Sequence, residues 1–409
     1  MRILELTEAA AGGVGRHVID LSEGLLARGH EVHLAYSTFR SDDVFAEDLR
    51  RLKRMSGLET CRIQMRHMPS LTDIGAINTV RHYLKDRGPF HLLHCHSTKA
   101  GMIGRLAVLS GSPGCLYTPH GMFAMDPNRS ALSKRLASAL EVALSDFGDR
   151  VIAVSAAEFA HAVEIGIPAS KLKIIPNGVT LASSSPASDR AQIRAEWGLH
   201  DSEVCIGFVG RLVPVKSPET MLKGFACLRD SVRERARLVM VGDGPLEPKL
   251  RRLTTNLGIA KSVTWLGARD ARTLMHVFDT LVVTSDSEVT PLVVLEAMTR
   301  GLPIVATRVG AVADTVQPGV NGFIVPVRGV GEITDALTVL VQNPDLRTRM
   351  GEASRRIVQA FSIDRMVDQT VRLYEEVVAR KTGTAAIPAE TTNNLPNGLI
   401  VERPRDVRS

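Results

Sequence analysis

Residues 284–298 read TSDSEVTPLVVLEAM, and the fold of the chain can be worked out from this stretch. The apolar residues just before it are typical of a buried β-strand, and Thr290 followed by Pro291 is typical of a helix start, with threonine as the N-cap and proline as the first helical residue. Such a helix leaves backbone N–H groups unpaired near Leu292 and Val293, and they attract a phosphate group. The stretch predicts a strand, a loop and a helix, as in parallel α/β sheets.

Two glutamates flank this predicted helix start. Glu288 lies in the loop before the helix, and Glu296 lies about a turn and a half beyond the start. Carboxylates in these positions can contact the two ends of one bound ligand, whereas a solvated pair on a helix surface is the structural alternative. Their setting between a strand end and a capped helix favours a role in binding.

A second strand and loop, at residues 205–217, carries two cations. The strand leads to Gly210, where the missing side chain lets a ligand approach the backbone. Arg211 can donate two hydrogen bonds to phosphate oxygens, and Lys216 supplies a compact positive charge. Surface cations in a loop are the alternative, but the position directly after a strand favours an anion site.

Strand-like apolar segments alternate with amphipathic segments along most of the chain, as in parallel sheets flanked by helices. The predicted strands are 2–6, 31–36, 91–96, 114–119, 151–154 and 172–176 in the first half, and 205–209, 237–241, 263–266, 280–284, 303–306 and 322–325 in the second. Gly242 and Gly267 each follow one of these strands, where strand ends line a ligand crevice, so both are candidate pocket walls. The pattern predicts an α/β protein with two Rossmann-like halves.

The 409 residues are too many for one ordinary core and favour two domains. A small, polar stretch near residue 184 predicts a linker, and the last residues show no periodicity. We expect an N-terminal domain at 1–180, a linker at 181–190, a C-terminal domain at 191–361, a closing helix at 362–381 that packs on the N-terminal domain, and a disordered tail at 382–409.

Composition excludes several classes of protein. No apolar run reaches the roughly 18 residues of a spanning helix, and the N-terminus lacks the apolar segment of a signal peptide. The five cysteines are scattered, as in a reduced cytoplasmic protein. The net charge of +6 comes without a nucleic-acid-binding module, so no nucleic acid is expected. The basic cluster at 50–54 is a candidate contact with an anionic membrane, with a solvated helix face as the alternative.

The first half contains a glycine-rich loop, with Gly12 and Gly13, after its first strand. Backbone amides there can approach a phosphate or a sugar closely. The dinucleotide fingerprint fails, because its third glycine position, counted from Gly13 and Gly15, holds Val18. A nicotinamide-dependent oxidoreductase is therefore disfavoured.

Histidines in the first half allow more than one interpretation. His120 follows a predicted strand, where it can face a ligand, although a lone histidine is as often structural. The run His94-Cys95-His96 superficially resembles a metal site. Because successive strand residues alternate between faces, Cys95 lies opposite the two histidines, and we expect no metal.

Together these stretches resemble glycosyltransferase family 4, the retaining enzymes of the GT-B fold, over about residues 1–375. The motifs that carry the resemblance are Gly-Gly at 12–13, Thr-Pro-His-Gly at 118–121, Ile-Pro-Asn-Gly-Val at 175–179, Gly-Arg-Leu at 210–212 with Lys216, and the glutamates 288 and 296. The resemblance implies two Rossmann-like domains that face each other across a cleft, with a C-terminal helix returning to the N-terminal domain.

The resemblance also implies roles for the side chains. Arg211 and Lys216 would neutralise the donor diphosphate, Glu296 would hold the ribose, and Glu288 would contact the donor sugar, which His120 would approach from the other domain. No metal or other cofactor is implied, and the chain has no Asp-x-Asp element placed to hold a divalent cation. Where family members often have Glu-Gly-Phe-Pro, residues 288–291 read Glu-Val-Thr-Pro, which leaves the identity of the sugar open.

The expected function is that of a retaining, metal-independent hexosyltransferase. It would move a sugar from a nucleoside-diphosphate donor to a glycan or lipid-linked acceptor, such as an exopolysaccharide precursor, in the cytoplasm or at the inner face of the membrane. A non-catalytic subunit that binds a nucleotide sugar and acts as a scaffold is the alternative from a different class.

Overall fold

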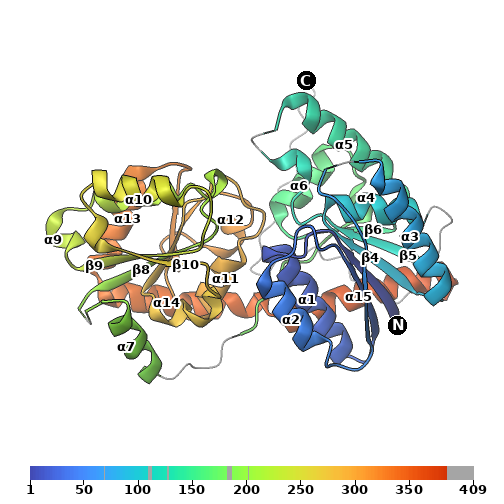
Figure 1. Ribbon diagram of the computed structural model, residues 1–409, viewed down its shortest axis with the longest axis horizontal. Helices are drawn as coiled ribbons and strands as arrows, with labels where there is room; N and C mark the ends of the chain where they lie inside the picture. The colour runs from blue at the N-terminus through green and yellow to red at the C-terminus, as the bar shows by residue number, and fades with distance from the viewer. Residues whose placement is uncertain (69, 109–112, 127–128, 182–186, 201, 385–409) are drawn as a thin grey trace. The chain divides into compact units, whose positions relative to one another are not determined.

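The computed structural model describes residues 1–68, 70–108, 113–126, 129–181, 187–200 and 202–384. The chain forms two compact units, which Figure 1 shows as separate α/β bodies. The first unit comprises residues 1–178 and the chain from Ile363 onward, and the second comprises Val179–Ser362. Part of the expected linker, 182–186, and almost all of the expected tail, 385–409, lie outside the described residues.

The first unit is built on a seven-stranded parallel sheet. Its strands are β1 (Arg2–Thr7), β2 (Glu31–Tyr36), β3 (Leu58–Arg62), β4 (Leu92–His96), β5 (Gly114–Thr118), β6 (Arg150–Ala153) and β7 (Leu172–Ile174), in the order β3-β2-β1-β4-β5-β6-β7. Its helices are α1 (Gly12–Ala27), α2 (Asp43–Leu52), α3 (Thr72–Arg87), α4 (Thr98–Ala107), α5 (Ala131–Ser145), α6 (Ala156–Glu164) and α15 (Ile363–Thr382), with short 3-10 turns η1 (Phe123–Met125) and η2 (Ala169–Lys171).

Alternate residues of this sheet enter two hydrophobic cores, one on each face. Ile3 and Leu92 pack with α1, α2 and α15, and Leu4 and Leu93 pack with residues of α3, α4 and α6. Burial on both faces explains why these strands are apolar almost throughout. The helix α15 belongs to the first of these cores, in which Val367 and Tyr374 are fully buried.

The second unit is a six-stranded parallel sheet with the order β10-β9-β8-β11-β12-β13. The strands are β8 (Val204–Val209), β9 (Ala236–Val241), β10 (Val263–Gly267), β11 (Thr280–Val283), β12 (Ile304–Thr307) and β13 (Gly322–Val325). The helices are α7 (Ala187–Glu196), α8 (Pro218–Ala226), α9 (Asp230–Arg233), α10 (Glu247–Asn256), α11 (Leu292–Thr299), α12 (Val312–Thr315), α13 (Val330–Gln342) and α14 (Pro344–Val358). Short 3-10 turns are η3 (Pro214–Lys216), η4 (Ala260–Ser262), η5 (Ala271–Thr273), η6 (Met275–Val277) and η7 (Gln359–Phe361).

In each sheet the strands that follow one another along the chain are added first on one side of a central strand and then on its other side. In the first unit β1 lies between β2 and β4, and in the second β8 lies between β9 and β11. Loops that leave two such neighbouring strands diverge to opposite faces, and ligands of open α/β sheets bind in the space between them. We call these two places the first and second switch points.

The structure confirms the predicted α/β class, and every predicted strand is present to within two residues. The sequence analysis missed β3. This strand lies at the sheet edge and is only partly buried, so its sequence, Leu-Glu-Thr-Cys-Arg, lacks an apolar run. Among the described residues, no helix combines the length and the apolar character needed to cross a membrane.

Candidate functional site

Three glycines lie at the carboxyl ends of three neighbouring strands of the second sheet. The N–H of Gly210, after β8, donates to the carbonyl of Val241, at 3.0 Å, and the N–H of Gly242, after β9, donates to the carbonyl of Gly267, at 2.7 Å. Gly242 has φ +130°, and a Cβ there would lie 2.1 Å from the carbonyl oxygen of Gly210. Close packing of the two loops therefore requires this glycine, whether or not a ligand also touches it.

The two predicted cations lie at the second switch point. Lys216 ends η3 and forms an ion pair with Glu288, whose carboxylate also accepts a hydrogen bond from Ser285 Oγ, at 2.7 Å. The hydroxyl of Thr284, just beyond β11, donates to the carbonyl of Lys216, at 3.1 Å, so the two loops are joined. Arg211 is exposed and forms no ion pair with any residue that the structure describes.

The helix that follows this loop starts one residue later than the sequence predicted. It is α11, which begins at Leu292, so Pro291 is the N-cap residue and no side chain caps the helix. The expectation that Thr290 is the N-cap and Pro291 the first helical residue was wrong. The carbonyl of Pro291 accepts the N–H of Val294, at 2.9 Å. The amides of Leu292 and Val293 come before this first bond, in the turn of a helix where N–H groups have no partner within the helix.

The loop that carries Glu288 is held by backbone contacts with a neighbouring loop. The N–H of Ala311 donates to the carbonyl of Val289, at 2.8 Å, and a Cβ at Gly310 would lie only 2.0 Å from the carbonyl oxygen of Glu288. Glu296, on α11, is half-buried. Two joined loops and a short helix thus present Lys216, Glu288 and Glu296 at one edge of the sheet.

The remaining predicted residues lie in the first unit. Gly12 and Gly13 begin α1 and are exposed, and the N–H of Gly12 donates to the Asp42 carboxylate, at 2.9 Å. That amide is already paired within the unit. His120 follows β5 in the left-handed backbone region, with φ +54°, a strained conformation for a residue other than glycine.

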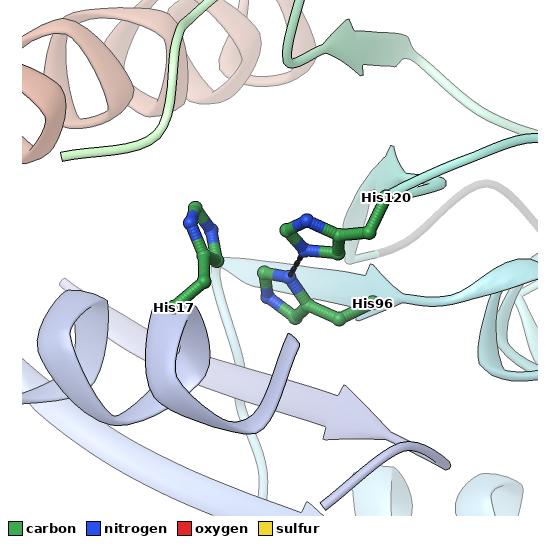
Figure 2. A group of neighbouring side chains, drawn as sticks. All are labelled: His17, His96 and His120. Carbon is green, nitrogen blue, oxygen red and sulfur yellow. Dashed lines mark hydrogen bonds between the residues drawn. The ribbon is translucent and has the colours of Figure 1, made fainter. Parts of the chain in front are cut away.

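His120 is part of a histidine cluster at the first switch point, which Figure 2 shows. His17 comes from α1, His96 from the end of β4 and His120 from the loop after β5, and their rings point toward one another. His96 Nδ1 and His120 Nε2 lie 3.1 Å apart, and the ring centroids of His17 and His120 lie 4.5 Å apart, edge to face. The sequence analysis identified only His120 as a site residue.

A buried polar layer continues from this cluster into the core. His96 Nε2 lies 2.6 Å from the carboxylate of Glu5, which also accepts the hydroxyl of Tyr374, at 3.0 Å. His94 Nδ1 lies 2.6 Å from that hydroxyl, and its Nε2 lies 2.8 Å from Thr118 Oγ1. The carboxylate of Glu5 among the apolar residues Ile3, Leu4 and Leu6 of β1, and the His-x-His alternation of β4, were the sequence signals for this layer.

Burial keeps most of these imidazoles uncharged. It lowers the pKa of His17 to about 3, with a smaller contribution from His96, and it lowers the pKa of His94 and of His120 well below the usual value, again with smaller contributions from neighbouring histidines. Neutral imidazoles offer one donor and one acceptor nitrogen each. The first switch point is therefore a hydrogen-bonding site with few charges.

The cluster also bears on the expectation that no metal binds. Cys95 packs in the opposite core, as the alternation predicted. However, His17, His96 and His120 together, and Glu5, His94 and His96 together, place possible ligand atoms within 4.8 Å of one another. The sequence argument considered only neighbours along one strand, so it did not test these groups.

Glu158 of α6 holds the loop that carries His120 through a hydrogen bond to the next residue, Gly121. This buried carboxylate accepts the N–H of Gly121, at 2.7 Å, and that of Val154, at 2.8 Å. Burial raises its pKa to about 7, although the N–H donors act in the opposite direction. Ser155 is the N-cap of α6, and its hydroxyl accepts the N–H of Glu158, at 3.1 Å, a Ser-x-x-Glu signal that the sequence analysis did not use.

Two Rossmann-like sheets in one chain, the second with basic and acidic side chains at its switch point, define an α/β protein of the GT-B class. Residues 11–183 match the family described as "Glycosyltransferase Family 4", and residues 189–357 match "Glycosyl transferases group 1". The chain belongs to this family and is a glycosyltransferase.

Curated relatives and solved structures agree with this assignment. The chain is 31% identical to a D-inositol 3-phosphate glycosyltransferase of Corynebacterium jeikeium, over 70% of this chain and 73% of the relative. It is 26% identical to the Escherichia coli UDP-Gal:alpha-D-GlcNAc-diphosphoundecaprenol alpha-1,3-galactosyltransferase, over 77% and 83%. Anabaena Alr3699/HepE, solved with UDP-glucose, superposes with a TM-score of 0.77 at 23% identity, covering 94% of this chain and all of that one, which confirms the fold.

Proposed function

We propose that this chain is a retaining, metal-independent hexosyltransferase that uses a nucleoside-diphosphate sugar. The observation that carries the proposal is the second switch point, where Lys216 and Glu288 are paired beside exposed Arg211 and the start of α11. Two cations and a helix start suit a diphosphate, and the carboxylates suit the hydroxyl groups of a sugar and a ribose. Relatives that act on UDP-galactose, or were solved with UDP-glucose, support this class of donor.

The proposed reaction needs no nucleophile from the protein. The bond from the sugar C1 to the diphosphate oxygen breaks, and a bond from C1 to the acceptor oxygen forms on the same face. The acceptor proton passes to the leaving phosphate. Arg211, Lys216 and the amides of Leu292 and Val293 stabilise the charge that develops on the diphosphate, which is the role a divalent cation has in other transferases.

The proposed acceptor is a lipid-linked or cell-surface glycan precursor, met in the cytoplasm at the inner face of the membrane. One relative acts on a diphosphoundecaprenol substrate. In this chain Leu132, Leu136 and Leu140 form an exposed apolar stripe on α5, with exposed Arg135 beside it. Such a helix face suits an anionic bilayer surface.

A thermal-shift panel of UDP, GDP and ADP, run in chelator, tests the donor. We expect one diphosphate to raise the melting temperature of the wild-type protein, because it binds only the native state, and to raise it less in Arg211→Ala and Glu296→Ala. If none of the three has an effect, the donor assignment is wrong. Binding without release of diphosphate on lipid-linked acceptors would instead favour a non-catalytic scaffold.

A further inference from the structure

Large apolar side chains on the protein surface are concentrated in the first unit. Among the described residues, every exposed leucine, isoleucine, methionine and phenylalanine belongs to that unit. Most of them lie in two segments, the start of α3 and the helix α5: Met68, Leu71, Ile74, Leu132, Leu136 and Leu140. Single apolar side chains are common on protein surfaces, whereas groups of them mark a contact with another molecule.

Helix α5 has its apolar face on the outside. A surface helix usually turns its apolar face toward the core and its polar face toward solvent. In α5, Leu132, Leu136 and Leu140 recur every four residues, so they share one face of the helix, and all three are exposed. Only three residues of α5 are buried, and one of them is the carboxylate residue Glu141.

Two buried ion pairs connect both segments to α4, the helix that packs against α3 and α5 (Figure 1). Arg105 of α4 donates to Glu141 on α5, at 2.8 Å. Lys99, in the first turn of α4, donates to Asp73 on α3, at 2.6 Å. None of the four side chains is more than 10% exposed. Breaking such a pair leaves a buried charge, which is strongly destabilising, so each pair keeps its helix in one orientation. The fold therefore holds the apolar side chains of both segments toward the surface.

The unpaired charges of the two segments are all positive. Arg66, Lys134 and Arg135 form no ion pair with any residue that the structure describes. The acidic side chains of the same segments already have partners. Two of them form the buried pairs with α4, and Asp146, just beyond α5, pairs with Lys171, at 3.3 Å. The apolar groups are thus accompanied by cations that attract an anionic surface.

We propose that α5 and the start of α3 together form one docking surface for an anionic lipid bilayer. The exposed leucines enter the boundary between headgroups and acyl chains, and Arg66, Lys134 and Arg135 contact the anionic headgroups. The purpose of this docking, access to a lipid-linked acceptor, rests on the proposed function, whereas the binding to a bilayer does not. Lys99 and Arg105 are the residues that hold the two segments in place from beneath.

A second copy of this chain is the competing occupant of the same surface. In a two-fold contact the same patch of both copies meets, so the unpaired cations of one copy approach those of the other. The segments offer no unpaired carboxylate among the described residues to compensate for this repulsion. An anionic bilayer supplies both an apolar layer and the opposite charge.

Sedimentation of the full chain with lipid vesicles, in the absence of any nucleotide sugar, tests the proposal. We expect binding to phosphatidylglycerol vesicles that is about 100-fold tighter than binding to phosphatidylcholine vesicles, because three cations each contribute to the attraction by anionic headgroups. No binding to phosphatidylglycerol, or equal binding to the two lipids, would overturn the proposal.

Two double variants test whether both segments take part. Leu132→Gln with Leu136→Gln, and Leu71→Gln with Ile74→Gln, should each weaken vesicle binding about tenfold, because less apolar surface leaves water. Val339→Gln, which changes an exposed apolar residue of α13 in the second unit, is the matched control and should bind as wild type does. Melting temperatures show that the variants fold. If either folded double variant keeps wild-type affinity, the two segments do not form one surface.

Sedimentation velocity without lipid tests the competing account. We expect the two leucine substitutions on α5 to leave the sedimentation coefficient unchanged. A dimer that these substitutions dissociate would overturn the proposal, because a second copy would then cover the leucines. The thermal-shift panel separates this proposal from the proposed function. If vesicles bind but no nucleoside diphosphate raises the melting temperature, only the proposed function fails, and the converse result rejects only the docking surface.

Discussion

The two switch points occupy equivalent places in two sheets of the same topology, and their chemistry is opposite. At the first, histidines and a carboxylate are buried, and the imidazoles are largely neutral. At the second, Arg211 is exposed and Lys216 and Glu288 are charged and partly exposed. A charge can stay near the surface without a large desolvation cost, whereas a buried polar group must be hydrogen-bonded. One sheet topology thus supports a charged site suited to a diphosphate and a neutral site suited to hydroxyl groups.

The largest expected effect comes from the charged site. Arg211→Ala should lower kcat/KM for the nucleotide sugar by about 100-fold to 1,000-fold, because a group that stabilises developing charge is lost. Lys249→Ala, which removes an exposed cation of α10 in the same unit, is the matched control and should stay near the wild-type rate. If the two variants lose activity equally, general electrostatics rather than a site would be responsible.

A smaller effect should come from the neutral site. The family resemblance implies an uncharged hydrogen bond from His120 to the sugar, so His120→Ala should lower kcat/KM by about tenfold, or about 1.4 kcal/mol. The Kd of the free nucleoside diphosphate should not change, because that part of the donor is assigned to the second unit. A loss of diphosphate affinity in this variant would contradict the assignment of the diphosphate to the second unit alone.

The neutral site also predicts a pH dependence of stability. The pKa of His17 is about 3 in the folded protein and 6.5 ordinarily, so its stabilising contribution is complete above pH 6.5 and is lost as pH falls toward 3. The slope for one such group is about 1.4 kcal/mol per pH unit. Urea unfolding of wild type and His17→Gln between pH 7 and pH 4 should give a shallower slope for the variant. Glu158 acts in the opposite direction in both proteins, so identical slopes would show that His17 is not buried as a neutral ring.

The smallest expected effect is that of a chelator. Since cations of the protein take the role of a metal in the proposal, EDTA should change turnover by less than about twofold. If turnover falls tenfold and Mg²⁺ or Mn²⁺ restores it, metal independence is contradicted. If only Zn²⁺ restores turnover, the histidine cluster is the expected zinc site.

The positions of the strands, apart from β3, could be predicted from the sequence because buried parallel strands are apolar and glycine loops mark their ends. The sequence predicted Lys216 and Glu288 for the same reason, since each follows such a strand. The start of α11 was misplaced by one residue because a threonine before proline suits a cap, and the actual N-cap has no side-chain bond. Glu5, His17, His96 and Tyr374 could not be grouped from spacing, because the topology joins residues up to 369 positions apart.

Calorimetric titration of the nucleoside diphosphate that gives the largest thermal shift tests the central claim most directly. In chelator, the wild-type protein should bind it, and the double variant Arg211→Ala with Lys216→Ala should bind it about 100-fold more weakly, as expected for the loss of two charge-assisted hydrogen bonds. A Kd for the folded double variant within twofold of the wild-type value would show that the diphosphate does not bind at the second switch point.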